Sequence, residues 1–249
     1  MKTSIIGQQL VELDLAESTN KTAAEMLGLS KLLHGAVILA HEQSAGRGQR
    51  GRVWHSGPGL DLTFSVVVRP RDLRAEQQFV LSKLAALAVY ALVSSVVPNG
   101  VRIKWPNDIL IGRQKVAGIL IQNELAGDRV LWSIIGIGLN VNSRAFEADL
   151  EATSLALAVG GDLDRFSLLE IFCQHFERLW SEWDGGGRAW EERYTELLWS
   201  RGRWAAVVLD GNPLMVRPMD VDRQGRLIVE LEDGSVASYG LDRLRFASR

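Results

Sequence analysis

An arginine- and glycine-rich segment is the most unusual part of the sequence. Residues 42–54 read EQSAGRGQRGRVW and directly follow the apolar run 36–40. Glycine lets backbone amides turn toward an anion and approach it closely, and arginine offers planar forks of donors that suit phosphate and carboxylate. Trp54 adds a flat face for stacking. The segment predicts an anion-binding loop, although alone it fits a solvated basic loop or an RNA-binding patch as well.

A second cluster, Lys104-Trp105-Pro106-Asn107-Asp108, combines charge with a rigid backbone. Pro106 fixes the chain and Trp105 can anchor it in the core, so that Asn107 and Asp108 are presented at a sheet edge. Lys104 could reach a phosphate, and Asp108 could hold that lysine, an arginine or a magnesium ion. A turn with a charged tip would have the same composition.

Two further stretches place glycine or lysine where a strand normally avoids them. The stretch KVAGIL opens with Lys115, whose ammonium is costly to bury without a partner. Gly118 weakens a strand interior unless something approaches the backbone there. Gly136 and Gly138, in GIGLNVN, close another strand and indicate close approach in the same way. Each stretch alone fits a purely structural explanation.

Apolar periodicity predicts the elements that position these residues. A polar helix start at Ser18-Thr19-Asn20 precedes a buried strand and a long core helix. Consecutive hairpins indicate a largely antiparallel or mixed sheet, hence an α+β fold, rather than regular alternation of strands and helices. A tail of about 45 residues with short strands indicates a small β-barrel. The expected strands are 36–40, 60–68, 101–104, 109–111, 115–122, 130–137, 205–209, 213–216, 227–230 and 236–239, and the expected helices are 22–27, 75–97, 167–184 and 188–200.

Composition excludes several classes of protein. A net charge of −2 over 249 residues gives no general attraction to nucleic acid or to anionic membranes. The single cysteine, Cys173, lies in an apolar helical rhythm and is expected to be an inert core thiol. The four histidines do not cluster with it, which argues against a zinc site. The first residues lack a secretory signal, and the apolar region 84–97 is shorter than the roughly 20 residues that span a bilayer. We therefore expect a cytoplasmic protein.

Taken together and in this order, the clusters resemble the biotin–protein ligase family, also called the biotin operon repressor and holocarboxylase synthetase family. The matching text is STN, EQSAGRGQRGRVW, KWPND, KVAGIL and GIGLNVN, within residues 18–142. The resemblance implies a mixed sheet with helices, similar to class II aminoacyl-tRNA synthetases, in a catalytic domain over residues 1–200. It also implies an SH3-like β domain over residues 201–249.

The resemblance also implies roles for individual residues. Lys115 and Arg47 would be catalytic, and Asp108 could contribute to a magnesium site. Biotin would contact Ser18, Thr19, Asn20, Gln43, Gly46, Arg47, Gly48, Gln49, Lys115, Gly118, Gly136 and Gly138. The nucleotide would contact Arg50, Arg52, Trp54, Lys104, Asn107, Asp108 and Asn140.

The implied reaction joins biotin to AMP at the expense of ATP and Mg²⁺, and then passes the biotinyl group to a lysine of a biotin carboxyl carrier protein. Only 17 residues precede Ser18, too few for a helix-turn-helix unit, so no DNA binding is expected. Edge strands could pair between two chains, which leaves a homodimer open.

One position departs from the family pattern, which usually has arginine where this chain has Gln49. That arginine is associated with retention of biotinyl-AMP, so we expect looser retention here unless Arg50 or Arg52 compensates. The alternatives are a lipoate–protein ligase, which shares the fold and the acyl-adenylate chemistry, and a non-catalytic biotin sensor. The arginine loop differs from the usual lipoate form, and Lys104, Asn107, Asp108 and Lys115 argue against a sensor.

Overall fold

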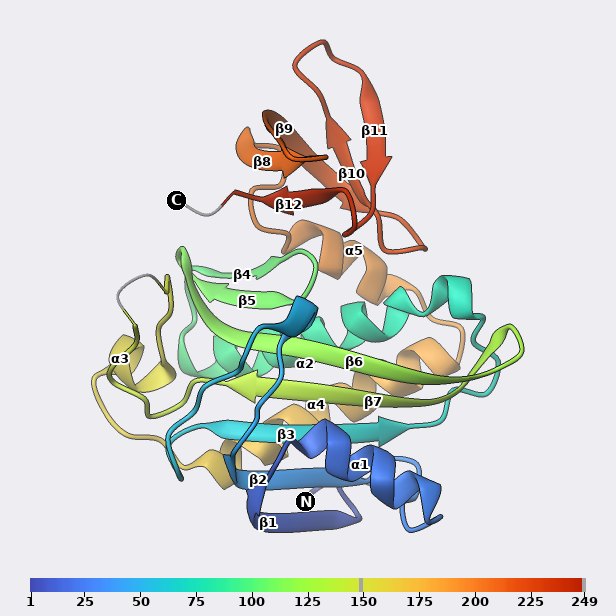
Figure 1. The fold of residues 1–249 in the computed structure, drawn as a ribbon, viewed down its shortest axis with the longest axis vertical. Helices are drawn as coiled ribbons and strands as arrows, with labels where there is room; N and C mark the ends of the chain where they lie inside the picture. Colours follow the sequence, from blue (N-terminus) through green and yellow to red (C-terminus); the bar gives the residue numbers. More distant parts are fainter. Residues whose placement is uncertain (148–149, 248–249) are drawn as a thin grey trace.

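Two β-sheets organise the computed structural model, which describes residues 1–147 and 150–247. The larger sheet has seven strands in the order β1-β2-β3-β7-β6-β5-β4 (Figure 1). Its strands are β1 (Leu10–Ala16), β2 (Val37–Gln43), β3 (Leu62–Val68), β4 (Val101–Lys104), β5 (Asp108–Ile111), β6 (Gln114–Ala126) and β7 (Arg129–Leu139). Strands β1 and β2 run parallel and the other neighbours are antiparallel. The predicted mixed sheet is therefore confirmed, with β1 as a strand that was not predicted.

Helices cover both faces of this sheet. The helices are α1 (Thr19–Gly28), α2 (Phe79–Val96), α3 (Leu155–Val159), α4 (Arg165–Asp184) and α5 (Ala189–Glu196). Figure 1 shows α1 on one face, with α2 and α4 behind the sheet. On that second face Phe64 of β3 meets Phe172 of α4, with ring centroids 4.9 Å apart. Because both faces are covered, every residue of β3 is buried, which explains why its sequence is mostly apolar and not alternating.

The longest apolar helix belongs to this core. Residues Ala75–Val96 are long and apolar enough to cross a membrane by length and composition, although we expected this region to be too short. Leu81, Leu84 and Leu92 of α2 are nevertheless fully buried within the protein. Cys173 of α4 is also fully buried, and burial raises the pKa of its thiol to about 12, consistent with an inert core cysteine.

The smaller sheet lies near the C-terminus and has five strands in the order β11-β10-β9-β8-β12. They are β8 (Ala205–Leu209), β9 (Asn212–Val221), β10 (Leu227–Glu230), β11 (Val236–Tyr239) and β12 (Leu244–Phe246). We expected a closed barrel, but among the described residues β11 pairs only with β10 and β12 only with β8, so this sheet is open. Closure would require partners on both sides of every strand.

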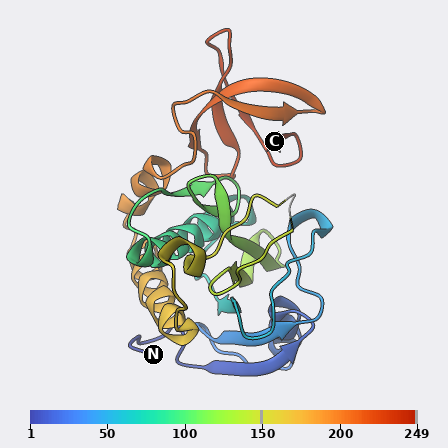
Figure 2. The same cartoon turned by 90° about the vertical axis from the view of Figure 1, so that its left-hand side faces the viewer.

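Several hydrogen bonds join the smaller sheet and the segment before it to helix α2 and to the β4–β5 hairpin of the larger sheet. Trp105 Nε1 donates to the Gly225 carbonyl at 2.9 Å, and Lys83 Nζ donates to the Val221 carbonyl at 2.7 Å. Trp199 N donates to the Ile103 carbonyl at 2.8 Å. In the turned view the small sheet stands above the large one, beside the light-blue segment around residue 50 (Figure 2). The arrangement brings C-terminal residues next to β4 and β5.

Candidate functional site

A single large cavity of about 1240 Å³ collects the residues that the sequence analysis selected. It opens between the end of the large sheet, the arginine-rich segment and the small sheet. The whole predicted set lines it: Ser18, Thr19, Asn20, Gln43, Gly46, Arg47, Gly48, Gln49, Arg50, Arg52, Trp54, Lys104, Asn107, Asp108, Lys115, Gly118, Gly136, Gly138 and Asn140. These segments, which are separate in the sequence, therefore meet at one cavity, and the individual roles of their residues stay predictions.

A buried polar network forms one end of the cavity. Ser18 caps α1 and accepts from the backbone N–H of the first turn, while Thr19 N donates to Gln43 Oε1 at 2.9 Å. Ser65 Oγ of β3 lies 2.7 Å from both Thr19 Oγ1 and Asn20 Oδ1. Because these groups hold one another, their positions are fixed before any ligand arrives. Sequence reasoning missed Ser65, whose only signal is a hydroxyl within an apolar strand.

Glycines in the strands make room for protein side chains. A Cβ at Gly136 would lie 2.3 Å from Asn20 Oδ1, and one at Gly138 would lie 2.3 Å from Trp54 Cε2. A Cβ at Gly118 would lie 3.2 Å from Trp54 Cζ3. The predicted close approach to these glycines is confirmed: Asn20 approaches Gly136, Trp54 approaches Gly138, and Lys115 and Trp54 both approach Gly118. The absence of side chains at these glycines therefore lets Asn20 and Trp54 pack directly against the strands and form part of the cavity wall.

The arginine-rich segment is a tight hairpin. Arg47 and Val53 form an antiparallel bridge, and Trp54 N donates to the Gly46 carbonyl at 3.0 Å. A Cβ at Gly46 would lie 2.4 Å from the Trp54 carbonyl oxygen, so only glycine fits at the base. At the tip Arg50 has a left-handed backbone, with φ 56°. The hairpin carries Trp54 into the cavity, where its buried indole N–H has no acceptor among the described residues.

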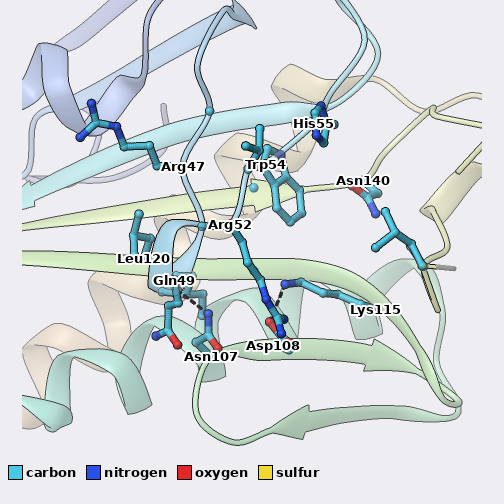
Figure 3. A pocket seen from close by; sticks show the side chains of 18 of the residues that line it. Arg47, Gln49, Arg52, Trp54, His55, Asn107, Asp108, Lys115, Leu120 and Asn140 are labelled. Atoms are coloured by element: carbon cyan, nitrogen blue, oxygen red, sulfur yellow. Dashed lines mark hydrogen bonds and ion pairs between the residues drawn. The ribbon is translucent and has the colours of Figure 1, made fainter. Parts of the chain in front are cut away.

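The charged group of Arg47 does not join Lys115. Arg47 Nη2 lies 3.3 Å from Glu17 Oε1, and Figure 3 shows the side chain pointing away from Lys115. Glu17 also pairs with Lys21; the hydrogen bond from Lys21, followed by the charges of Lys21 and Arg47, lowers the pKa of the Glu17 carboxyl. Arg47 and Lys115, the two residues that were expected to be catalytic, therefore line the same cavity but do not point toward one another, and the Arg47 guanidinium pairs with Glu17 instead.

Lys115 finds its partner on the neighbouring strand. Its Nζ lies 2.7 Å from Asp108 Oδ1 and 5.5 Å from the centroid of the Trp54 ring (Figure 3). Asp108 is thus paired with Lys115, and Lys104 has different neighbours. The Lys115 backbone is fixed as well, because its N–H donates to the Glu151 carbonyl at 2.7 Å. The arrangement places one oriented ammonium group inside the cavity.

Two amides complete the wall near this lysine. Asn107 Nδ2 donates to the Ile119 carbonyl and Asn140 Nδ2 to the Thr153 carbonyl, both at 2.9 Å. Both side chains are therefore held by the main chain. Among the described residues, no three His, Cys, Asp or Glu side chains gather at metal-binding distance.

Residues after position 142 also line the cavity, and none of them was predicted. They come from the segment after β7 and from the small sheet, and they include Ser143, Phe146, Val208, Leu241, Leu244, Arg245 and Phe246. No local pattern marks them, because their position depends on how the small sheet docks on the large one.

Comparisons with known proteins agree with this geometry. Residues 13–140 match the model of the biotin/lipoate A/B protein ligase family. The bifunctional ligase/repressor BirA of Bacillus subtilis is 34% identical, over 97% of this chain and 75% of its own length. The biotin–[acetyl-CoA-carboxylase] ligase of Mycobacterium tuberculosis is 31% identical, over 88% of this chain and 84% of its own length.

Solved structures show the same fold. The biotin protein ligase of Aquifex aeolicus in complex with biotin and ATP has a TM-score of 0.80 at 24% identity, with 96% of this chain and 100% of that chain covered. The biotin protein ligase of Leishmania major in complex with biotinyl-5-AMP has a TM-score of 0.65 at 26% identity, with 94% and 99% covered.

Proposed function

The chain belongs to the biotin/lipoate A/B protein ligase family, and from that membership we propose that it is an ATP-dependent biotin–protein ligase. It forms biotinyl-5′-AMP and pyrophosphate from biotin and ATP, and then biotinylates a lysine of a biotin carboxyl carrier protein. The observation that carries the proposal is the paired Lys115 and Asp108 at 2.7 Å, inside one cavity with the Ser18–Asn20 network and the arginine-rich hairpin. Relatives named biotin–[acetyl-CoA-carboxylase] ligase support the choice of acyl acceptor.

Biotin binds with its ring at the polar end of the cavity. The hydroxyls of Ser18 and Thr19 and the amides of Asn20 and Gln43 offer both donors and acceptors to a cyclic urea. Their mutual hydrogen bonds keep them in place, so little ordering is needed on binding. The carboxylate of biotin then extends toward Lys115.

Activation brings two anions together. A carboxylate oxygen of biotin attacks the α-phosphorus of ATP, a new O–P bond forms, and the bond to pyrophosphate breaks. The approach is electrostatically opposed unless positive charge is positioned at the meeting point. Lys115 supplies that charge, and Asp108 keeps its ammonium oriented. No enzyme nucleophile is required.

Magnesium would enter with the nucleotide. The cavity offers few carboxylates, of which Asp108 is the one beside Lys115. This fits Mg²⁺, which usually keeps several waters and takes only one or two protein carboxylates together with substrate phosphates. Asp108 would hold the ion, which would neutralise charge that develops on the phosphates.

Transfer needs protection of the intermediate. Biotinyl-AMP is a mixed anhydride that water hydrolyses, so the hairpin of residues 46–54 covers it and excludes water. The amine of the carrier lysine attacks the acyl carbon, an amide forms, and AMP leaves with the electrons of the broken C–O bond. The proposal extends to a cytoplasmic location and to an SH3-like character of the second domain, residues 201–249, which rest on the family resemblance.

The decisive experiment is transfer of labelled biotin to a carboxylase carrier domain in the presence of ATP. Label on the carrier lysine and release of pyrophosphate are expected. Lipoate in place of biotin should give no label, because the hairpin sequence differs from the usual lipoate form. Pyrophosphate release without transfer would remove the second half of the proposal. Biotin binding without pyrophosphate release would identify a sensor and overturn it.

A further inference from the structure

Two aromatic rings from outside the large sheet hold Lys104. Its Nζ lies 5.4 Å from the centroid of the Trp199 ring and 5.8 Å from that of the Phe246 ring. The two rings meet edge to face, with centroids 5.1 Å apart and an interplanar angle of 85°. An ammonium within about 6 Å of a ring centroid is attracted by the negative face of the ring. Lys104 is thus in cation–π contact with both residues.

This environment differs from that of Lys115 and Arg47, the two cavity cations that are expected to be catalytic. Lys115 is paired with Asp108 and Arg47 with Glu17, whereas no carboxylate in residues 1–147 and 150–247 forms an ion pair with Lys104. A carboxylate orients a cation and also weakens its attraction for a second anion. Aromatic rings orient it and leave the charge in place. Lys104 therefore keeps its full attraction for an anion that enters the cavity.

The backbone places this cluster of Lys104, Trp199 and Phe246, which we call the clamp, at the β4 edge of the large sheet. Lys104 is opposite Asp108 in the β4–β5 register, and Asp108 is opposite Gly118 in the β5–β6 register. Lys104 is therefore two strands from β6, toward the small sheet. The Trp199 N–H donates to the Ile103 carbonyl at 2.8 Å, which keeps the indole beside β4.

The second ring, that of Phe246, comes from the small sheet. It belongs to β12 of the small sheet, which pairs with β8 through Phe246 and Val207. Both Lys104 and Phe246 line the same cavity. The clamp thus closes only when the small sheet is docked on the large one.

We propose that Trp199 and Phe246 are positioning residues, which hold Lys104 against the terminal phosphates of bound ATP, the part that leaves as pyrophosphate. This inference rests on the proposed function. In the proposed reaction Lys115 of β6 contacts the biotin carboxylate and the α-phosphate of ATP. Lys104 lies on β4, two strands further from the biotin-binding residues, and would therefore contact the β- and γ-phosphates. The small sheet then contributes to nucleotide binding through Phe246.

The test uses substitutions that keep apolar bulk and remove the aromatic face, in the full-length protein. Trp199→Leu and Phe246→Leu should each raise the KM for ATP roughly two- to fivefold, the size expected for one partly exposed cation–π contact. Phe246→Tyr should behave like the wild type. Direct binding of inorganic tripolyphosphate, measured by calorimetry, should weaken by the same factor, while inhibition by AMP and the Kd for biotin stay unchanged.

Trp204→Leu is the matched control. Arg217 Cζ lies 5.6 Å from the Trp204 ring, so this variant removes a similar contact at the small sheet but outside the cavity lining. It should leave the KM for ATP unchanged. In a Lys104→Met background, Phe246→Leu should add no further effect on tripolyphosphate binding, because the two changes act through one contact.

Two outcomes would overturn the inference. One is an unchanged KM for ATP and unchanged tripolyphosphate binding in both leucine variants. The other is an equal loss in Trp204→Leu, or a parallel loss of biotin affinity, which would reveal a general loosening of the small sheet. Failure of the wild type to release pyrophosphate would count against the proposed function instead, and tripolyphosphate binding would still decide the role of the clamp.

Discussion

The ammonium of Lys115 and the carboxylate of Asp108 lie 2.7 Å apart across the neighbouring strands β6 and β5. The pair explains how a lysine at the start of an apolar strand is tolerated, since a half-buried cation needs a counter-charge. The ion pair also fixes the direction in which the ammonium group points.

Lys115→Ala should therefore abolish formation of biotinyl-AMP, with a loss of at least about 100-fold, as when one positioned charge-stabilising group is removed. The fold should persist, because the Lys115 side chain is 34% exposed and its ion pair is with a partly exposed partner. Pyrophosphate release with saturating biotin measures the loss, and the thermal midpoint is the control. Near-normal adenylate synthesis would exclude Lys115 from the reaction.

Gly138→Ala should displace Trp54. The added Cβ would lie 2.3 Å from Trp54 Cε2, and such an approach forces the ring to shift. We expect the KM for ATP to rise about tenfold if the displaced indole costs roughly 1.4 kcal/mol of binding. The matched control is Gly28→Ala, where an added Cβ meets nothing within 4 Å. An unchanged KM in Gly138→Ala would show that Trp54 makes no contribution to nucleotide binding.

The sequence predicts those elements whose apolar pattern is strong. The helix α2 and the strands β3 and β6 stand out because they are buried or strictly periodic. Strand β1 was missed because it is an edge strand, whose residues are mostly half-buried or exposed. Strand β12 was missed because three residues carry no periodicity. The open arrangement of the small sheet could not be predicted either, because the local sequence of a strand does not determine which other strands it pairs with.

The site residues that lie in recognisable motifs were predicted from the sequence, and those that lie outside the motifs were missed. Glycine and lysine within strands are unfavourable unless something compensates, and the alternating glycines and arginines of residues 46–52 suit an anion-binding loop, so these positions identified the cavity wall. The ion pair of Arg47 with Glu17 left no signal, since a glutamate before a helix normally reads as a solvated charge. Trp199 and Phe246 left none either, because apolar residues near a chain end resemble ordinary core. Tertiary contacts alone give these residues their place at the site.

Gln49→Arg should slow the release of biotinyl-AMP. Gln49 lies in the hairpin that lines the cavity, and a neutral amide holds a phosphate less strongly than a guanidinium does. One added charge-assisted contact is expected to slow release roughly tenfold. The free intermediate after rapid dilution of the loaded enzyme is the quantity to measure, with Gln49→Lys as a check on charge alone. Equal release from the wild type and Gln49→Arg would mean that Arg50 or Arg52 already supplies the charge.

The stability of the protein should depend on pH through Glu177 of α4. Its carboxylate accepts from the backbone N–H groups of Ser4, Ile5 and Ile6, at 2.7–3.1 Å. Burial raises the pKa of Glu177, but the hydrogen bonds from these three amides outweigh it, and the net pKa lies below the usual value of 4.5. A lowered pKa stabilises the fold above the pKa of the unfolded chain, and the contribution is lost as pH falls through the folded value. 

Glu177→Gln should accordingly lower the thermal midpoint at pH 7 by roughly 2–4 °C, if the charged acceptor contributes about 1 kcal/mol. The difference from the wild type should shrink as pH falls below the usual value of 4.5, because the stabilisation is lost when the carboxylate is protonated. Glu25→Gln, at an exposed position of α1, is the control and should leave the midpoint unchanged at both pH values. Calorimetric scans between pH 3 and pH 7 measure the effect, and a midpoint difference that stays constant over this range would show that the charge of Glu177 does not stabilise the segment.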